Sequence, residues 1–416
     1  MNPFIITVIG GGVFTPRLCE ALASTIALPE LELRLSARRI DRLRILADHS
    51  ARRLATAHPD WSVRAAPSLE AAVEGATLIV LLVRVGGLEA RAWDEEFPRR
   101  FGLVGDEGLG PGGIANAWRT LPELAGIANV IKETAPAARI LNLMAPLGAT
   151  TRLLLEQGLD AVGLCELPLV TIETWLDQAS ASAGRATWRY GGLNHLGWFW
   201  DVRDGDEDVL ARIADLPVTL PGAAPVDRPT LKHFQAAPLR YFYEIFDREA
   251  GRRLKLERAP NRARQLMTLS ESLLERFAAT PGHSIPEAEA RPTPWLDRAV
   301  APVAAALLGG SPHAAFANLR NGDSIPELPP ELVVELGATY DAAGISPAPA
   351  GPLPLRVSRF LRQVGETEAL TYRAASQRDP GLLAEAVRSL PLSIPETQVK
   401  ELACLARADN FRQESR

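Results

Sequence analysis

A thiol and an imidazole each stand at the end of an apolar run in this chain. Cys165 follows the run from Ala161 to Leu164, and His195 lies within Gly191-Gly-Leu-Asn-His-Leu-Gly-Trp. A thiolate and a neutral imidazole together can hold a divalent cation and leave positions open for substrate oxygens, as a catalytic metal site requires. The alternative is structural, because an isolated cysteine often packs as a small apolar residue and an isolated histidine as a core residue. Spacing alone leaves both readings open.

The N-terminus carries a second pattern with chemical meaning, a glycine-rich turn directly after an apolar run. The segment from Phe4 to Ile9 is typical of a strand and continues into Gly10-Gly-Gly-Val-Phe-Thr-Pro. Absent side chains at such a turn let the backbone approach a pyrophosphate that sits at the N-terminus of the next helix. The match to the dinucleotide-binding pattern is partial, because Thr15 stands where the third glycine is usual. The residues expected to contact a dinucleotide are Gly10, Gly11, Gly12, Phe14 and Thr15.

The end of the second expected strand bears on which dinucleotide binds. An NAD site normally has an acidic residue there for the ribose hydroxyls, whereas this chain reads Ser36-Ala-Arg-Arg. Arg38 would suit the 2′-phosphate of NADP. The alternative is that Arg38 and Arg39 only begin a solvated helix. NAD and NADP therefore both remain candidates.

The order of apolar segments predicts an α/β protein whose first half is a Rossmann-type parallel sheet. Short β-branched runs alternate with helical segments, and such alternation places helices on both faces of a parallel sheet. The pattern then changes to aromatic, polar and proline-rich segments. We expect a dinucleotide-binding domain over residues 1–186, and a mixed α+β domain for substrate, metal and oligomerisation over 187–416. The expected strands of the first half are Phe4 to Ile9, Leu31 to Leu35, Leu78 to Val83, Ile140 to Met144 and Ala161 to Leu164.

Composition excludes several other classes of protein. The 416 residues are 47% hydrophobic and 23% charged, which is typical of a packed globular chain rather than a disordered one. A net charge of -5 without a basic block gives no footprint for nucleic acid, so a small-molecule partner is expected. Three dispersed cysteines indicate a reducing, cytoplasmic environment rather than a disulfide framework. We expect no membrane span, because no apolar run reaches about 18 residues.

Several longer motifs, spread over nearly the whole chain, are specific to one enzyme family. In the order in which they occur, they resemble those of glycoside hydrolase family 4, especially its phospho-β-glucosidase branch. The motifs are Ile9-Gly-Gly-Gly-Val-Phe-Thr-Pro, Arg84-Val-Gly-Gly-Leu-Glu-Ala-Arg, Gly110-Pro-Gly-Gly, Arg119-Thr-Leu-Pro, Gly163-Leu-Cys, Gly192-Leu-Asn-His-Leu-Gly-Trp and Asn321-Gly-Asp-Ser-Ile-Pro-Glu-Leu-Pro.

The resemblance implies a lactate/malate-dehydrogenase-like fold that uses NAD(H) and Mn²⁺, or another divalent metal, to cleave a 6-phospho-β-glucoside or free glucoside. Members of this family do not use the usual pair of catalytic carboxylates. Hydride passes from C3 of the sugar to the nicotinamide, and the ketone so formed acidifies the C2 proton. After a base removes that proton, the aglycone leaves by β-elimination, water adds, and the hydride returns to C3, so the cofactor is not consumed. A homodimer or homotetramer is expected.

The same resemblance assigns roles to particular residues. It implies that Cys165 and His195 hold the metal and that Asn194 contacts the substrate. The base is a tyrosine in a helical run that reads Leu239-Arg-Tyr-Phe-Tyr-Glu here, so Tyr241 is favoured and Tyr243 is the alternative. Arg91 is the expected sugar-phosphate contact, because a guanidinium offers a planar fork to phosphate oxygens; its alternative role is an ion pair with Asp94 or Glu95.

Three departures from the family pattern limit these expectations. Ala145 stands where an asparagine usually contacts the substrate, Glu166 follows the metal cysteine in place of asparagine, and Ala37 replaces the ribose-binding acid. Pro168 agrees with the β-type branch. Two rival functions therefore stay open: a nicotinamide-dependent sugar or 2-hydroxy-acid dehydrogenase, and a catalytically silent paralogue that binds a sugar phosphate or nucleotide.

Overall fold

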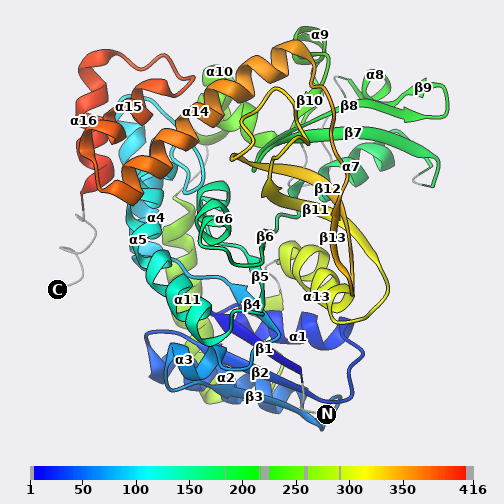
Figure 1. Cartoon of the computed structure of the whole chain (residues 1–416), viewed down its shortest axis with the longest axis vertical. Helices are drawn as coiled ribbons and strands as arrows, with labels where there is room; N and C mark the ends of the chain where they lie inside the picture. The colour runs from blue at the N-terminus through cyan, green and yellow to red at the C-terminus, as the bar shows by residue number, and fades with distance from the viewer. Residues whose placement is uncertain are drawn as a thin grey trace.

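A computed structural model describes residues 4–182, 184–214, 216, 224–256, 261–289 and 292–408. Within them, one mixed sheet of 13 strands runs through the molecule, with helices packed around it (Figure 1). The main path of the sheet has the order β10-β8-β7-β12-β11-β6-β5-β4-β1-β2-β3.

The first half of the chain forms the parallel part of this sheet. The strands β1 to β6 are all parallel and have the spatial order 3-2-1-4-5-6, which is that of the dinucleotide-binding fold. The predicted Rossmann-type sheet is therefore confirmed, although the strand β3 was not expected from the sequence. The bounds are β1 Phe4–Ile9, β2 Leu31–Ser36, β3 Trp61–Ala65, β4 Leu78–Leu81, β5 Arg139–Asn142 and β6 Ala161–Gly163.

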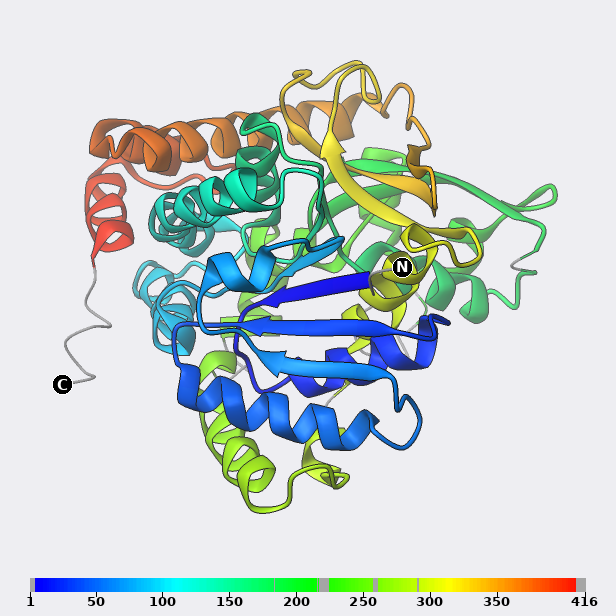
Figure 2. The ribbon, with the colours of Figure 1, turned by 60° about the horizontal axis from the view of Figure 1, so that its bottom comes forward.

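Helices cover both faces of the parallel strands, because alternate strand residues point to opposite sides. Ile6 and Val8 pack with one core, which includes α1, whereas Ile79 and Leu81 pack with another, which includes α5. Figure 2 shows α2 running alongside β3 and β2. The helices of this half are α1 Thr15–Thr25, α2 Ile40–Leu54, α3 Leu69–Val73, α4 Gly87–Glu96, η1 Phe97–Phe101, α5 Gly110–Thr134, α6 Leu147–Glu156 and α7 Leu167–Gln178.

The second half extends the same sheet with antiparallel strands. The antiparallel strands join the parallel half at one residue pair, Asn318 of β11 with Gly163 of β6. The change to antiparallel pairing begins at β7, next to the predicted domain boundary at residue 187, which stays a prediction. The strands are β7 Ala186–Leu193, β8 Leu196–Asp204, β9 Glu207–Asp208, β10 Ala237–Pro238, β11 His313–Arg320, β12 Val333–Asp341 and β13 Gly344–Pro347.

Helices of the second half pack back onto the first half. The helix α11 lies against α2 and α4, and α14 and α16 lie against α5. None of the helices in the described ranges is both long and apolar enough to cross a membrane. The bounds are α8 Val209–Ile213, α9 Arg228–Phe234, η2 Phe242–Phe246, α10 Arg248–Gly251, η3 Arg252–Leu256, α11 Arg262–Ala279, α12 Pro286–Glu289, η4 Leu296–Val300, α13 Ala301–Leu307, α14 Leu355–Gln377, α15 Pro380–Ser389 and α16 Glu396–Arg407.

Candidate active site

Cys165 lies just beyond the end of β6 and before the first turn of α7. Its side chain is buried, and burial raises the pKa of the thiol well above its ordinary value; Glu335 and Glu166 raise it further. A hydrogen bond with the Asn194 side chain acts in the opposite direction. Two neighbouring carboxylates make a thiolate unfavourable here unless a cation is also present, and a coordinating metal deprotonates a thiol outright. The surroundings of Cys165 therefore suit a bound cation.

His195 sits in the tight turn between β7 and β8. Its backbone φ is 65°, in the left-handed region that few residues other than glycine adopt, and such strain often marks a functional residue. The ring atom Nδ1 is buried and has no hydrogen-bond partner among the described residues. Loss of solvent lowers the pKa of His195 to about 4, although the nearby Asp106 opposes this shift. A neutral imidazole with an unpaired buried nitrogen is the form that binds a metal.

Asn194 connects the two predicted metal ligands. It directly precedes His195, and its side chain forms a hydrogen bond with Cys165. Its Nδ2 also donates a hydrogen bond to Glu335 Oε1 at 3.0 Å. The two residues singled out by spacing are therefore brought into one neighbourhood. Their role as metal ligands stays a prediction, and so does the substrate contact of Asn194.

The two candidate base tyrosines have different surroundings. The ring of Tyr241 stacks on that of His195, with centroids 4.2 Å apart and planes inclined by only 3°. The hydroxyl of Tyr243 instead donates a hydrogen bond to Asp227 Oδ2 at 2.5 Å, and its side chain is buried. Both lie at a short π-helical turn, η2, rather than in an ordinary α-helix. Only Tyr241 touches the candidate metal site.

Charged groups surround the Tyr241 hydroxyl. Burial, and next the charge of Asp106, raise the pKa of Tyr241 above its ordinary value, whereas Arg240 lowers it. The Arg240 guanidinium lies 4.9 Å from the centroid of the ring, and its Nη2 donates a hydrogen bond to the Tyr241 hydroxyl at 3.4 Å. A donor of this kind stabilises the phenolate form that a base requires.

The glycine turn after β1 has the conformation expected of a dinucleotide site. Gly10 has φ 140°, and an added Cβ would lie 2.9 Å from the backbone of Leu82, so only glycine fits there. At Gly12 an added Cβ would meet nothing within 4 Å, so the turn is open at that point. Thr15 closes the turn, because its hydroxyl donates a hydrogen bond to the Gly12 carbonyl at 2.7 Å. Phe14 caps α1 without a side-chain hydrogen bond, which leaves the helix N-terminus available to an anion.

The end of β2 lies directly against this turn. The Gly10 amide donates a hydrogen bond to the Ser36 carbonyl at 2.8 Å, and the Cβ of Ala37 lies 2.7 Å from where a Cβ of Gly11 would be. The position normally held by the ribose-binding acid is thus next to the turn, but it carries only a methyl group. Arg38, the next residue, is exposed.

Arg91 is engaged in ion pairs with acidic neighbours. Its Nε lies 2.7 Å from Glu95 Oε1, and its Nη1 lies 3.0 Å from Glu107 Oε1. The alternative sequence interpretation, a pair with Glu95, is therefore present, whereas Asp94 pairs with Arg119 at 2.6 Å. Nothing in these contacts tests a role of Arg91 toward phosphate, which stays a prediction.

Two family departures lie close to the site. The Ala145 carbonyl accepts a hydrogen bond from Asn116 Nδ2 at 3.0 Å, so this position contributes only its backbone. Glu166 stands at the N-cap of α7, and burial raises the pKa of its carboxyl, an effect that Arg240 opposes. Glu166 therefore adds an acidic group, instead of the usual amide, next to the predicted metal ligand.

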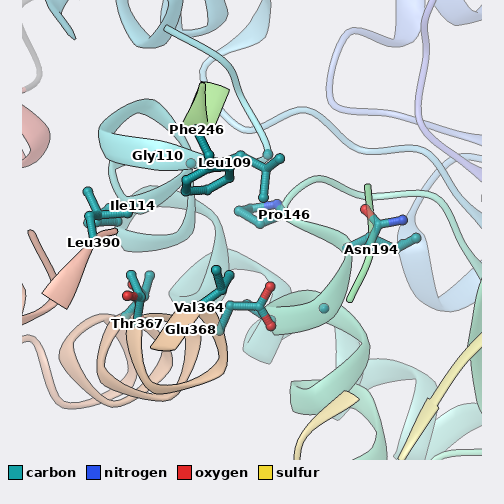
Figure 3. A pocket seen from close by; sticks show the side chains of 16 residues that line it. Leu109, Gly110, Ile114, Pro146, Asn194, Phe246, Val364, Thr367, Glu368 and Leu390 are labelled. Atoms are coloured by element: carbon teal, nitrogen blue, oxygen red, sulfur yellow. The ribbon is translucent and has the colours of Figure 1, made fainter. Parts of the chain in front are cut away.

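A small recess, with a volume of about 40 Å³, opens beside Asn194 (Figure 3). The first turns of α5 and α6 border it, together with Glu368 on α14. Burial raises the pKa of the Glu368 carboxyl to about 8. Figure 3 shows this carboxyl on the side of the recess that faces Asn194. Glu368 would therefore border any ligand that extends from the metal site past Asn194.

Sequence reasoning missed several polar residues of this region. Asp106 and Glu368 stand in segments without a distinctive local pattern, and Arg240 lies in the tyrosine-containing run but was given no role. Glu335 did leave a signal, because it is one acidic residue within the apolar run Leu332-Val-Val-Glu-Leu. A charged residue inside an otherwise buried strand is uncommon without a specific partner.

Comparison with known proteins identifies the family. The model of the family 4 glycosyl hydrolases matches residues 5–180, and that of their C-terminal domain matches residues 190–392. The chain belongs to glycoside hydrolase family 4. Family 4 relatives include a probable 6-phospho-beta-glucosidase of Bacillus subtilis, 26% identical over 96% of this chain and 94% of the relative. A 6-phospho-beta-glucosidase of Thermotoga maritima is 27% identical over 82% of this chain and 83% of its own.

Solved structures confirm the predicted fold of this family 4 chain. The 6-phospho-beta-glucosidase of Thermotoga maritima, solved with manganese, NAD+ and glucose-6-phosphate, superimposes with a TM-score of 0.85 at 24% identity, covering 99% of this chain and 98% of the other. A lactate dehydrogenase from a deep-sea metagenome library matches with a TM-score of 0.54 at 12% identity, covering 90% of this chain and 100% of the other. The expected dehydrogenase-like architecture is therefore present.

The raised pKa of Glu368 predicts a pH-dependent cost to stability. Its carboxyl titrates near 4.5 when unfolded and near 8 when folded, so the unfolded chain binds fewer protons between these values and stability falls as pH rises. We expect Glu368→Gln to remove this loss. The difference in melting temperature between the variant and the unmodified chain should therefore be larger at pH 9 than at pH 5, by on the order of 2 °C in favour of the variant. Glu366→Gln, exposed on the same helix, is the control. A difference that does not change with pH would contradict the assignment.

Proposed function

We propose that this chain is a nicotinamide- and Mn²⁺-dependent glycosidase that cleaves a 6-phospho-β-glucoside by C3 oxidation, C2 deprotonation, β-elimination, water addition and re-reduction. The observation that carries the proposal is the gathering of Cys165, Asn194 and His195, with Tyr241 stacked on the imidazole. Family membership adds the reaction class. The names of the two β-type relatives supply the substrate class.

The β-type branch is favoured by the extent of the alignments. The β-type relative of Bacillus subtilis aligns with 96% of this chain. By contrast, the maltose-6′-phosphate glucosidase of Clostridium acetobutylicum, 28% identical, aligns with only 52% of it. Pro168, in the segment after the metal cysteine, points to the same branch.

The residues present suit both cofactors. The open glycine turn and the uncapped N-terminus of α1 would hold the pyrophosphate, and Cys165 and His195 would hold the cation. Within the described residues, no group of three or more His, Cys, Asp or Glu side chains is placed to hold a metal ion. Substrate oxygens or water would complete the coordination. When bound, the dinucleotide takes up and returns the C3 hydride, and the cation acts as a Lewis acid toward the C2 and C3 oxygens.

Tyr241 is the proposed base that removes the C2 proton. Its ring stacks on that of His195, so its hydroxyl would lie near a sugar bound to a cation at His195. Arg240 donates to the phenol oxygen and thereby favours the phenolate, whereas Asp106 disfavours it. Tyr243 is the less suitable alternative, because its hydroxyl is already committed to Asp227.

Further parts of the assignment follow from the family and the sequence. We assign Arg91 to the sugar phosphate; this role requires that it exchange part of its pairing with Glu95 and Glu107 for the ligand. Asn194 is assigned to the sugar hydroxyls near the cation. A homodimer or homotetramer in the cytoplasm is the proposed working form, and the free thiols of Cys19, Cys165 and Cys404 agree with a reducing compartment.

A catalytically silent, ligand-binding paralogue is the second candidate. Ala145 lacks the side chain that contacts the substrate in the family, and Glu166 places an acid beside Cys165 that could repel a phosphorylated sugar. Binding of cofactor and metal without turnover would mark this function. A plain sugar or 2-hydroxy-acid dehydrogenase would instead release reduced cofactor with each turnover.

The first prediction of this assignment concerns the metal. Turnover should require a divalent cation, preferably Mn²⁺, and a reducing agent, because oxidation of Cys165 removes a ligand. We expect Cys165→Ser and His195→Ala each to abolish glycoside cleavage, while calorimetric titration shows unchanged dinucleotide binding. Cys404→Ser, which changes an exposed thiol, is the control and should keep full activity. Full activity of Cys165→Ser after chelator treatment would refute the metal assignment.

The second prediction concerns the choice of dinucleotide. Since Ala37 cannot accept a hydrogen bond from the ribose and Arg38 can meet a 2′-phosphate, NADP should bind at least as tightly as NAD. Arg38→Ala should weaken NADP about tenfold, or about 1.4 kcal/mol, and leave NAD unchanged. Arg44→Ala, exposed in the second turn of α2, serves as the control. A tenfold or greater preference of the unmodified chain for NAD would show that Arg38 takes no part.

The third prediction tests the elimination route. A substrate deuterated at C2 should exchange its label with solvent during turnover, and thioglycosides should be cleaved, because elimination does not rely on strong protonation of the leaving atom. Tyr241→Phe should lose both activities, whereas Tyr243→Phe should keep most of each. The reverse pattern would move the base to Tyr243. Retention of deuterium during ordinary hydrolysis would contradict the mechanism and point to a carboxylate pair.

A further inference from the structure

Glu335 is a fully buried carboxylate in β12 that the proposed reaction does not use. Three side chains donate hydrogen bonds to it: Tyr190 at 2.5 Å, Asn318 at 2.9 Å and Asn194 at 3.0 Å. Three donors and no acceptor are the partners of an ionised carboxylate, which only accepts hydrogen bonds. Burial raises the pKa of Glu335 to about 7, and the three hydrogen bonds oppose this rise by favouring the negative charge.

That charge has no cationic partner on the chain. None of the ion pairs found in the described ranges includes Glu335. The ionisable groups that interact with it, Cys165 and Glu166, are acids and cannot supply a positive charge. Burial of an uncompensated charge costs several kcal/mol, and proteins usually pair such charges or place them beside a metal. The candidate metal site is close by, because the Asn194 side chain hydrogen-bonds to both Glu335 and Cys165.

The sheet is shaped to keep Glu335 in this position. Gly163, Asn318, Glu335 and Gly192 occupy one row across β6, β11, β12 and β7. A methyl group at Gly197 would overlap the Tyr190 hydroxyl, so the glycine there leaves room for the tyrosine to reach Glu335. The Tyr190 ring is also fixed between Phe199 and Phe316, at centroid distances of 4.4 and 4.7 Å.

We propose that Glu335 is a positioning residue for the metal site: it anchors Asn194, and hence the turn that carries His195, and its negative charge favours a cation at Cys165 and His195. This inference rests on the proposed metal site and deepens it. Outer partners of metal ligands commonly change metal affinity by 10-fold to 100-fold. The competing interpretation is a network that only stabilises the sheet.

The test is Mn²⁺ binding to the metal-free full-length chain, followed by electron paramagnetic resonance of free Mn²⁺, with NAD+ and glucose-6-phosphate at saturation. We expect Glu335→Gln, which keeps the shape and removes the charge, to weaken Mn²⁺ binding at least tenfold. Tyr190→Phe removes one donor but keeps the charge, and should change the affinity less than threefold. A purely structural role would lower the melting temperature of both variants and leave Mn²⁺ affinity unchanged, which would overturn the inference.

The same measurement distinguishes a wrong role for Glu335 from a wrong assignment of the metal site. If Cys165→Ser loses Mn²⁺ but Glu335→Gln binds it as the unmodified chain does, the metal site stands and the role of Glu335 is refuted. If the unmodified chain binds no Mn²⁺, both are refuted. If Glu335→Gln does not fold, Asn194→Ala removes the same hydrogen bond between Asn194 and Glu335. It should also weaken Mn²⁺ at least tenfold, and unchanged affinity there would equally refute the anchoring role.

Discussion

A single point of pairing between β6 and β11 joins the parallel half of the sheet to the antiparallel half, and the candidate site depends on it. Because Asn318 pairs with Gly163, the next strand, β12, brings Glu335 close to the end of β6, where Cys165 lies. The hairpin of β7 and β8 then adds His195. An added Cβ at Gly163 would lie 2.7 Å from Thr151 and 2.9 Å from Asn318, so a larger residue would push these strands apart.

Acidic groups outnumber basic groups around Cys165 and His195. Cys165, Glu166, Glu335 and Asp106 are all acidic groups, and Arg240 is the main positive charge that opposes them. Each carboxylate alone is costly to bury, but a divalent cation compensates several of them at once. The same charges would hinder an anionic ligand, so a phosphorylated sugar must keep its phosphate away from Cys165. Arg91, the proposed phosphate contact, lies on α4, where it pairs with Glu95 and Glu107.

The sequence predicted the fold well where its signals are local. Strand and helix alternation placed β1, β2, β4, β5 and β6 to within about two residues, and the glycine turn at Gly10 was recognisable because its conformation demands glycine. The residue pair Cys165 and His195 was also found, since each follows an apolar run. Glu335, Asp106 and Arg240 were missed, because their importance comes from strands and loops that meet only in the folded chain. Periodicity does not reveal such contacts, which are set by strand register.

Ala37, Ala145 and Glu166 follow the ends of strands β2, β5 and β6. Ligands of open α/β sheets bind at this edge. By contrast, residues that shape the backbone of the site, such as Gly10, Gly163 and Gly197, cannot change without steric overlap. Ligand contacts at strand ends are therefore free to vary while the scaffold stays fixed. Cys165, His195 and Tyr241 lie together through Asn194 and the stacked rings. The proposed reaction centre therefore depends on contacts other than the side chains of Ala37 and Ala145, so a change of substrate or dinucleotide at those positions would leave its geometry in place.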